Sequence, residues 1–158
     1  MKNTILFLFA LLFSIGAKSQ DAATTVEDNS MYAKLEKKAL DADKIFLIKK
    51  AIVITNADGD FFWPLYREYY SKLEELNNKN IALYSNYIEK KDNITFSQAM
   101  DLLEESMAID QDLLKLEKKY YKKMINGMNP VKVVAYFSLE REVQLKIRLE
   151  MIKEFHGE

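Results

Sequence analysis

The 158-residue chain contains no cysteine and a single histidine, His156. Without thiols it has no disulfides, no thiol redox chemistry and none of the cysteine ligands of structural zinc sites. Catalysis by a nucleophile needs a neighbouring base, commonly histidine, and His156 is expected in a disordered C-terminal tail. These absences argue against an active site, and the sequence predicts that the protein is not an enzyme.

Glycine and proline are also scarce, at four and two residues. A turn-rich β-sandwich or barrel needs more of both, so the composition favours long helices. A glycine-rich phosphate loop and the paired Glu-x-x-His motifs of di-iron bundles are missing from the sequence, and no cofactor is predicted. Acidic pairs stand among lysines and indicate solvated helix surface, with weak metal binding as the alternative: Glu74-Glu75, Glu104-Glu105 and Asp110/Asp112.

The first 19 residues have the three parts of a secretory signal peptide. Lys2 supplies positive charge, residues 5–15 are apolar apart from one serine, and Ala17-Lys18-Ser19 is a small-x-small cleavage pattern. The apolar stretch is about half the roughly 20 residues that span a bilayer, which disfavours an uncleaved anchor. We expect cleavage near Ser19/Gln20, residence in the periplasm and a disordered lead-in at residues 20–29.

Charge is nearly balanced in the part that follows the signal peptide. Residues 20–158 contain 21 Lys and Arg against 24 Asp and Glu, because residues 1–19 hold two lysines and no acid. A dedicated nucleic-acid binder usually shows a strong basic excess, so no nucleic-acid partner is predicted. The remaining length suits a single domain, expected at residues 30–156.

Apolar spacing predicts that the first two helices lie between Ser30 and Lys91. Ser30 is a suitable N-cap for a first helix through about residue 54, although residues 45–54 are apolar enough to mimic a buried strand. The second helix follows Thr55, and Pro64 near its start predicts a kink. Its seam follows a heptad pattern, with Asn80 as the polar exception: Phe62, Tyr66, Tyr69, Leu73, Leu76, Asn80, Leu83 and Tyr87.

Two further helices complete the expected fold. Thr95 and Gln98 form a capping box before a third helix that ends near Gly127, and Asn129-Pro130 starts a fourth. The third helix has the stripe Leu102, Ile109, Leu113, Leu116, Tyr120 and Met124, and the fourth has Val134, Phe137, Leu145, Leu149 and Ile152, widened by Val143 and Ile147. The sequence therefore predicts an all-α, elongated bundle of four helices, with surplus apolar surface that favours a homodimer.

Two helix starts, 40 residues apart, share one pattern. Ile54-Thr55-Asn56-Ala57-Asp58 and Ile94-Thr95-Phe96-Ser97-Gln98 each have an aliphatic residue, a threonine cap and a polar residue that can close the box. The pair resembles the two LTxxQ motifs of the Spy/CpxP family of periplasmic envelope-stress proteins. Both motifs differ from the family pattern, with Ile in place of Leu, and with Asp58 in place of Gln in the first. Ordinary helix capping is the alternative explanation.

A second segment carries the same resemblance further. The run Phe61-Phe62-Trp63-Pro64-Leu65-Tyr66 and the segment from Asn129 to Glu140 are similar to a subgroup of that superfamily, some of whose members are described as sensors of extracytoplasmic-function sigma factors. The resemblance covers roughly residues 35–155 and implies a helical periplasmic protein that is linked to envelope stress and acts by binding or sensing.

Aromatic and basic side chains are the candidates for partner binding. Trp63, Tyr70, Tyr84 and Tyr121 lie off the predicted core stripes, so they are assigned to a dimer interface or to a client-binding surface. Arg141 and Arg148, with Lys132, Lys146 and Lys153, either attract acidic partners or form a solvated helix face. Tyr66, Tyr69, Tyr87 and Tyr120 fall on the stripes and are expected in the core.

Three functions follow as hypotheses. The first is an ATP-independent chaperone that holds unfolded exported proteins on an amphipathic helical surface. The second is a regulatory sensor or adaptor that docks on the periplasmic part of a membrane signalling protein, such as an anti-sigma factor or a sensor kinase. The third, metal buffering by surface carboxylates, is disfavoured by the lack of cysteine and histidine.

Overall fold

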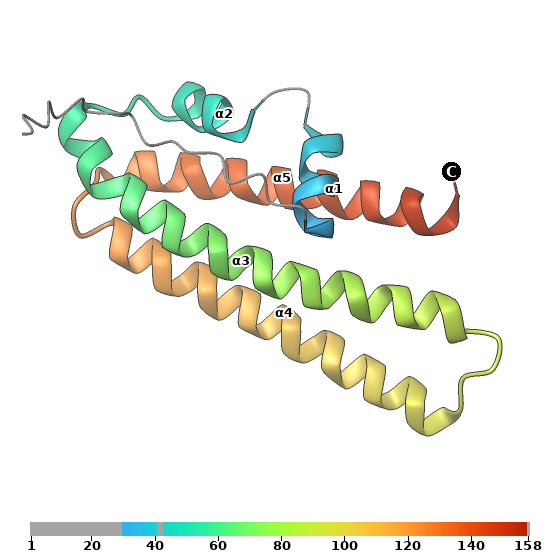
Figure 1. Ribbon diagram of the computed structural model, residues 1–158. Coiled ribbons are helices and arrows are strands. Elements are labelled where there is room, and N and C mark those ends of the chain that lie inside the picture. Colours follow the sequence, from blue (N-terminus) through green and yellow to red (C-terminus); the bar gives the residue numbers. More distant parts are fainter. Residues whose placement is uncertain (1–29, 41–42, 158) are drawn as a thin grey trace, which may run out of the picture.

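The computed structural model describes residues 30–40 and 43–157, and within these ranges all regular secondary structure is helical. The all-α prediction is confirmed, but the described part contains five helices, where four were expected. They are α1 (Met31–Ala39), α2 (Lys44–Ala51), α3 (Asn56–Lys90), α4 (Phe96–Met124) and α5 (Pro130–His156), as Figure 1 shows. None of the described helices is long and apolar enough to cross a membrane. The predicted signal peptide and lead-in lie outside the described residues.

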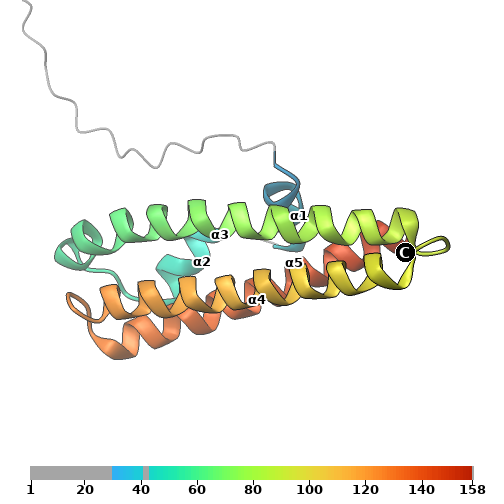
Figure 2. The same cartoon turned by 90° about the horizontal axis from the view of Figure 1, so that it is seen from below.

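Three long helices form the body of the protein, and the two short ones lie on one side of it. Helices α3 and α4 make a long antiparallel hairpin, with α5 running beside them (Figures 1 and 2). Helix α1 packs on α3 and α5, and α2 packs on α5, whereas neither contacts α4. Helices α4 and α5 meet at the connection that follows Met124 and diverge toward their other ends (Figure 1). The face shared by α4 and α5 is therefore not covered by the described part of the chain.

The single first helix of the sequence prediction is wrong, because the chain leaves the helical conformation after Ala39. Leu40 caps α1 with an extended backbone, and a new helix begins after Asp43, whose side chain accepts a hydrogen bond from the Phe46 amide. The break allows Lys44, at the start of α2, to reach the interior, where it is only 6% exposed. Capping at Asp43 and burial of Lys44 therefore favour two short helices, although the amino-acid composition of the segment would suit one continuous helix.

Both threonine caps form capping boxes. Thr55 Oγ1 accepts from the Asp58 amide while the Asp58 carboxylate accepts from the Thr55 amide, and Thr95 and Gln98 repeat this arrangement at the start of α4. Helix α3 continues through Pro64 without ending, and the kink there stays a prediction. Reciprocal capping satisfies donors that a helix start would otherwise leave unpaired, which fixes where both long helices begin.

The aromatic seam of α3 builds most of the core. Phe62, Tyr66 and Tyr69 are buried, and all three rings lie within 6.4 Å, centroid to centroid, of the buried Tyr136 ring of α5. Tyr120 is also buried, as expected. The prediction for Tyr87 is wrong: this side chain is 44% exposed, because it borders an open groove between the ends of α3 and α4.

The predicted inner face of the last helix is largely reversed. Of its expected main face, only Phe137 is buried; the others are exposed by 39–66%: Val134, Leu145, Leu149 and Ile152. The buried face is instead Val133, Tyr136, Phe137, Glu140, Val143, Ile147 and Met151. Helix α5 has apolar residues on two sides, and packing of α1 and α2 against one of them decides which side faces inward. The other side remains at the surface.

The end of α5 also differs from the prediction. His156 is the last residue of α5, and its Nε2 lies 2.9 Å from the Tyr84 hydroxyl of α3. The histidine is therefore held in a helix by a contact with α3, and the expectation of a disordered tail at this residue is wrong.

Gly127 permits the close approach of α3 to the turn after α4. A Cβ atom at this position would lie 2.6 Å from Phe61 Cζ, well inside van der Waals contact. We expect Gly127→Ala to displace the partly buried Phe61 ring and to destabilise the protein by about 1–3 kcal/mol, as overpacking does. Urea unfolding measures the loss. The exposed neighbour substitution Asn126→Ala is the control, and equal stability of the two variants would contradict the proposed clash.

The ion pair between Asp58 and Lys132 makes stability sensitive to acid. Lys132 Nζ donates to Asp58 Oδ2 at 2.7 Å, and this bond, with the hydrogen bonds from Thr55, lowers the Asp58 pKa from 3.8 to about 2. A lowered folded-state pKa contributes stability that is complete above the unfolded-state pKa and is lost as the pH falls through the folded-state value.

We therefore expect the melting temperature to fall between about pH 4 and pH 2, and Asp58→Asn to flatten that part of the profile. Thermal unfolding at a series of pH values tests this. Asp60→Asn, an exposed substitution outside this ion pair, should leave the wild-type profile in place. A wild-type slope retained in Asp58→Asn would show that other groups cause the acid sensitivity.

Candidate binding face on α4 and α5

Most of the exposed large apolar side chains belong to α4 and α5. Of the fifteen that are exposed in the described ranges, eleven belong to these two helices and a twelfth, Ile125, directly follows α4, with exposed fractions from 38% to 84%. They are Phe96, Met100, Leu103, Met107, Leu114, Tyr121 and Ile125 from α4 and just beyond its end, and Val131, Val134, Leu145, Leu149 and Ile152 from α5. We call this set the binding face. Exposed apolar surface concentrated on neighbouring elements can mark an interaction site in a soluble protein.

The α4 half of the binding face has a seven-residue period. Met100, Met107, Leu114 and Tyr121 are each separated by seven residues, which keeps them on one side of the helix. The inner stripe of α4, which includes Ile109, Leu116 and Tyr120, is buried. Helix α4 is thus apolar on two sides, and the buried side packs mainly against α3.

Two ion pairs bridge the helices next to the binding face. Arg141 of α5 pairs with Glu117 of α4 at 2.6 Å, and Arg148 pairs with Asp110 at 3.6 Å. Both arginine side chains are more than half exposed, so each pair is expected to contribute at most about 1 kcal/mol to stability. Each pair joins one positive and one negative side chain, so the two pairs add no net charge to the border of the face.

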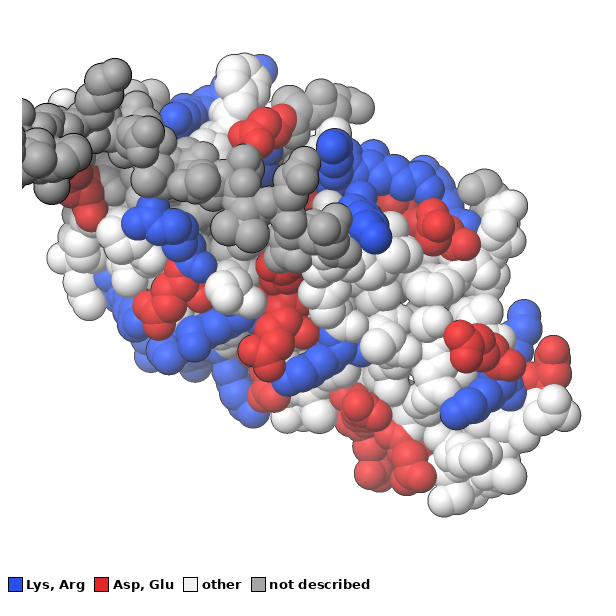
Figure 3. All heavy atoms as spheres, viewed as in Figure 1, with Lys and Arg blue, Asp and Glu red and all other residues white. Residues whose placement is uncertain are grey.

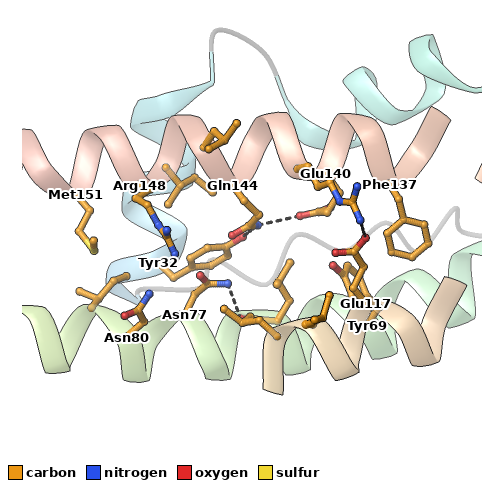
Figure 4. Close-up of a pocket in the computed structure, with 17 residues that line it drawn as sticks. Tyr32, Tyr69, Asn77, Asn80, Glu117, Phe137, Glu140, Gln144, Arg148 and Met151 are labelled. Carbon is orange, nitrogen blue, oxygen red and sulfur yellow. Dashed lines mark hydrogen bonds and ion pairs between the residues drawn. The ribbon is translucent and has the colours of Figure 1, made fainter. Parts of the chain in front are cut away.

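A cavity of about 420 Å³ lies between α3, α4 and α5. In Figure 4, Gln144, Arg148 and Met151 of α5 are seen opposite Asn77 and Asn80 of α3. Tyr32 of α1 lines the same space. The cavity joins the binding face, because Leu114, Leu145 and both bridging arginines belong to its lining.

Behind the cavity lies a cluster of buried charges that connects α1, α2 and α5. Lys44 Nζ donates to Glu36 Oε2 at 2.9 Å and to Glu140 Oε1 at 3.1 Å. Glu140 is 2% exposed, and the Tyr70 hydroxyl donates to the other oxygen of Glu36 at 3.0 Å. Gln144 extends the network by donating from Nε2 to Glu140 and to the Tyr32 hydroxyl. The cluster holds the two short helices on the body of the protein.

Burial and charge act on Lys44 in opposite directions. Burial by itself lowers the pKa of the ammonium group, but the neighbouring Glu140, Tyr32 and Glu36 groups outweigh it and hold that pKa well above the usual value. Burial also raises the pKa values of the Tyr32, Tyr70 and Tyr136 phenols. Lys44 therefore stays charged and these phenols stay protonated across the physiological range.

The predicted partner-binding residues separate into two groups. Tyr121, Arg141 and Arg148 lie on or beside the binding face, and Tyr121 is 41% exposed. The other three contribute to packing within the fold: Trp63 against Phe62 and Tyr66, Tyr70 against Tyr66 and Glu36, and Tyr84 against Phe155 and His156. The capping residues Thr55, Asp58, Thr95 and Gln98 act at the helix starts.

Sequence reasoning missed the α4 half of the binding face and the buried charges. The seven-residue spacing of Met100, Met107 and Leu114 was a signal for the first. No local pattern marks Glu36 and Glu140, which meet through Lys44 from positions far apart in the chain.

Charge on the visible surface is mixed. On the side drawn in Figure 3, basic and acidic side chains alternate without a large area of one sign. Across the described residues, no group of three or more histidine or acidic side chains is arranged to hold a metal ion. Neither observation favours a strongly charged partner or the metal-buffering hypothesis.

The chain was compared with known proteins by sequence and by structure. No protein-family model, curated protein or solved structure matches it. The resemblance to the Spy/CpxP family thus stays a prediction that rests on the motifs given above.

Proposed function

We propose that the protein is an exported, ATP-independent chaperone-like protein that holds apolar segments of unfolded proteins on the binding face. The exposed apolar surface of α4 and α5 is the observation that carries this proposal. The signal-peptide pattern of residues 1–19 supports export, and the motif resemblance supports a periplasmic role in envelope stress. The proposed function is binding alone, without a chemical reaction on the bound protein.

The composition of the face suits many clients rather than one. Met100 and Met107 are flexible and polarizable, a property that recurs on promiscuous binding surfaces. The ion pairs that Arg141 and Arg148 form beside the face have no net charge, so they repel neither acidic nor basic clients. Because the side chains of the face are exposed to solvent, we expect binding to be weak and reversible, which lets a held client leave and fold.

Suppression of aggregation tests the proposal directly. The purified protein, without nucleotide, is expected to suppress light scattering by an unrelated denatured protein at near-stoichiometric ratios. Serum albumin, added at the same mass concentration in place of the protein, controls for nonspecific crowding. Unchanged scattering at a tenfold excess of the protein would remove the chaperone proposal.

A regulatory sensor or adaptor is the second candidate, favoured by the seven-residue spacing on α4. Regular spacing fits one amphipathic helix, as in helix-in-groove recognition. Crosslinking in native envelopes, followed by purification, distinguishes the two functions. One saturable membrane signalling partner supports the adaptor, whereas many exported proteins support the chaperone.

A homodimer is a third use of the same surface, and we propose it as a competing state. Sedimentation velocity over a range of micromolar concentrations measures it. If dimers form and client binding falls as they accumulate, the second copy covers the binding face. Client binding that is independent of dimerisation would place the two contacts on different surfaces.

A further inference from the structure

The cavity behind the binding face has the dimensions and lining of a small-ligand site. Its volume of about 420 Å³ falls within the usual range of about 300–1,000 Å³ for such sites. Its walls are mainly apolar, with Leu73 and Ile81 from α3 and Ile147 and Met151 from α5. A few polar groups enter among them, and Figure 4 shows Asn77, Gln144 and Glu140 on the two sides of the space. Such a lining fits an apolar molecule with one polar end.

Two amide side chains of the lining, Asn77 and Gln144, offer their oxygen atoms as acceptors. Gln144 Nε2 donates to the Tyr32 hydroxyl at 2.6 Å and to Glu140 at 2.9 Å. Asn77 Nδ2 donates to the Leu73 carbonyl at 2.9 Å. Within the described residues, the amide oxygens of Asn77 and Gln144 accept no hydrogen bond in return. A ligand that donates hydrogen bonds therefore complements these two amide oxygens.

The charge beside the cavity also favours a cation. Glu140 lines it and is 2% exposed, and the cluster behind it contains two carboxylates, Glu36 and Glu140, for one ammonium, Lys44. The arginines at the border are each paired with an acid and add no net charge. Since electrostatic interactions are stronger away from bulk water, the excess carboxylate makes the interior attractive to a positive group.

We propose that this cavity binds an aliphatic cation, an apolar chain that ends in an ammonium or guanidinium group. The chain lies along the apolar walls, and the cationic end donates to the oxygens of Asn77, Gln144 and Glu140. Binding of a free amine in this cavity does not require a client on the binding face. The cation comes either from a free amphiphilic amine or from a lysine or arginine side chain of a bound protein.

Three probes with the same eight-carbon chain test the chemistry. Calorimetric titration of the full purified chain with octylammonium, octanol and octanoate compares a cation, a neutral donor and an anion. We expect octylammonium to bind at least about tenfold more tightly than octanoate, since hydrogen bonds to charged groups are the stronger ones. Equal or tighter binding of octanoate, or no binding of any probe at millimolar concentration, would overturn the proposal.

Substitutions locate the site. Asn77→Leu removes one acceptor and is expected to weaken octylammonium about tenfold and octanol by a smaller factor, because the hydrogen bond of a neutral donor is weaker. Glu140→Gln is expected to abolish the preference for octylammonium over octanoate, and Glu142→Gln, on the exposed side of α5, is its matched control. Circular dichroism checks folding, and if Glu140→Gln is unfolded the Asn77→Leu result decides. Unchanged probe affinities in folded Asn77→Leu and Glu140→Gln would place binding elsewhere and overturn the assignment.

Competition distinguishes the two sources of the cation. A client peptide is prepared with one lysine or with norleucine at the same position. If only the lysine peptide displaces octylammonium, a bound protein delivers the cation to the cavity. If octylammonium stays bound with either peptide, the cation is a free amphiphile.

Discussion

Replacing Lys44 with methionine is expected to destabilise the fold by about 3–5 kcal/mol, the usual cost of removing one partner from a buried ion pair. The substitution leaves the Glu36 and Glu140 carboxylates with no positive neighbour in the cluster, where their side chains are 12% and 3% exposed. It also detaches the start of α2 from α1 and α5. Urea unfolding followed by circular dichroism measures the change in the free energy of unfolding. If Lys44→Met has no helical signal at room temperature without urea, the loss exceeds the whole stability of the fold.

Lys38→Met is the matched control for this prediction. Lys38 pairs with Glu154 across α1 and α5, but both side chains are about half exposed, so its loss should cost much less stability than the loss of Lys44. Adding Glu140→Gln to Lys44→Met removes one uncompensated charge and should restore part of the stability, which a double-mutant cycle quantifies. Similar losses in the two lysine variants would show that burial of the Lys44 cluster has little energetic importance.

The sequence was sufficient for features that depend on neighbouring residues. The threonine caps at Thr55 and Thr95, and the Asn129-Pro130 start, predict where the three long helices begin, and the structure agrees. The prediction that Tyr66 and Tyr69 on the seam of α3 are buried is also confirmed. In each case the determining contacts lie within one or two helical turns, so spacing along the chain contains the required information.

The charged cluster could not be predicted in the same way. Lys44 and Glu140 are 96 residues apart, and either one alone has the appearance of a surface residue in a helix. The hydrogen bond that joins them depends on the break between α1 and α2, which is itself fixed partly by Asp43. A feature that needs a local break and a distant partner together is not visible in hydrophobic periodicity.

The reversed face of α5 has a related cause. Its sequence contains two apolar stripes, one through Val143 and Ile147 and another through Leu145 and Leu149. Periodicity shows that both exist, but the choice between them depends on α1 and α2, which pack against the first. The stripe that was expected in the core is consequently the one that supplies half of the binding face.

Two leucines at the centre of the binding face provide the sharpest test of its role. Leu114 and Leu149 are 63% and 57% exposed, so replacing both with glutamine should change stability by less than about 1 kcal/mol in total. If clients bury these side chains, the lost apolar contact is on the order of 2 kcal/mol, or about a thirtyfold loss of client affinity. Aggregation suppression and direct titration of a client peptide both measure this.

Phe46 and Val53 form a matched control pair, since they are 58% and 77% exposed but lie outside α4 and α5. Replacing both with glutamine removes a similar amount of exposed apolar surface from the other side of the protein, and client affinity should stay at the wild-type level. If both double variants lose activity equally, general surface hydrophobicity holds the client, and the geometry of α4 and α5 is not required. If only Leu114→Gln/Leu149→Gln loses client affinity, the apolar stripes of α4 and α5 bind the client. These stripes are uncovered because α4 diverges from α5.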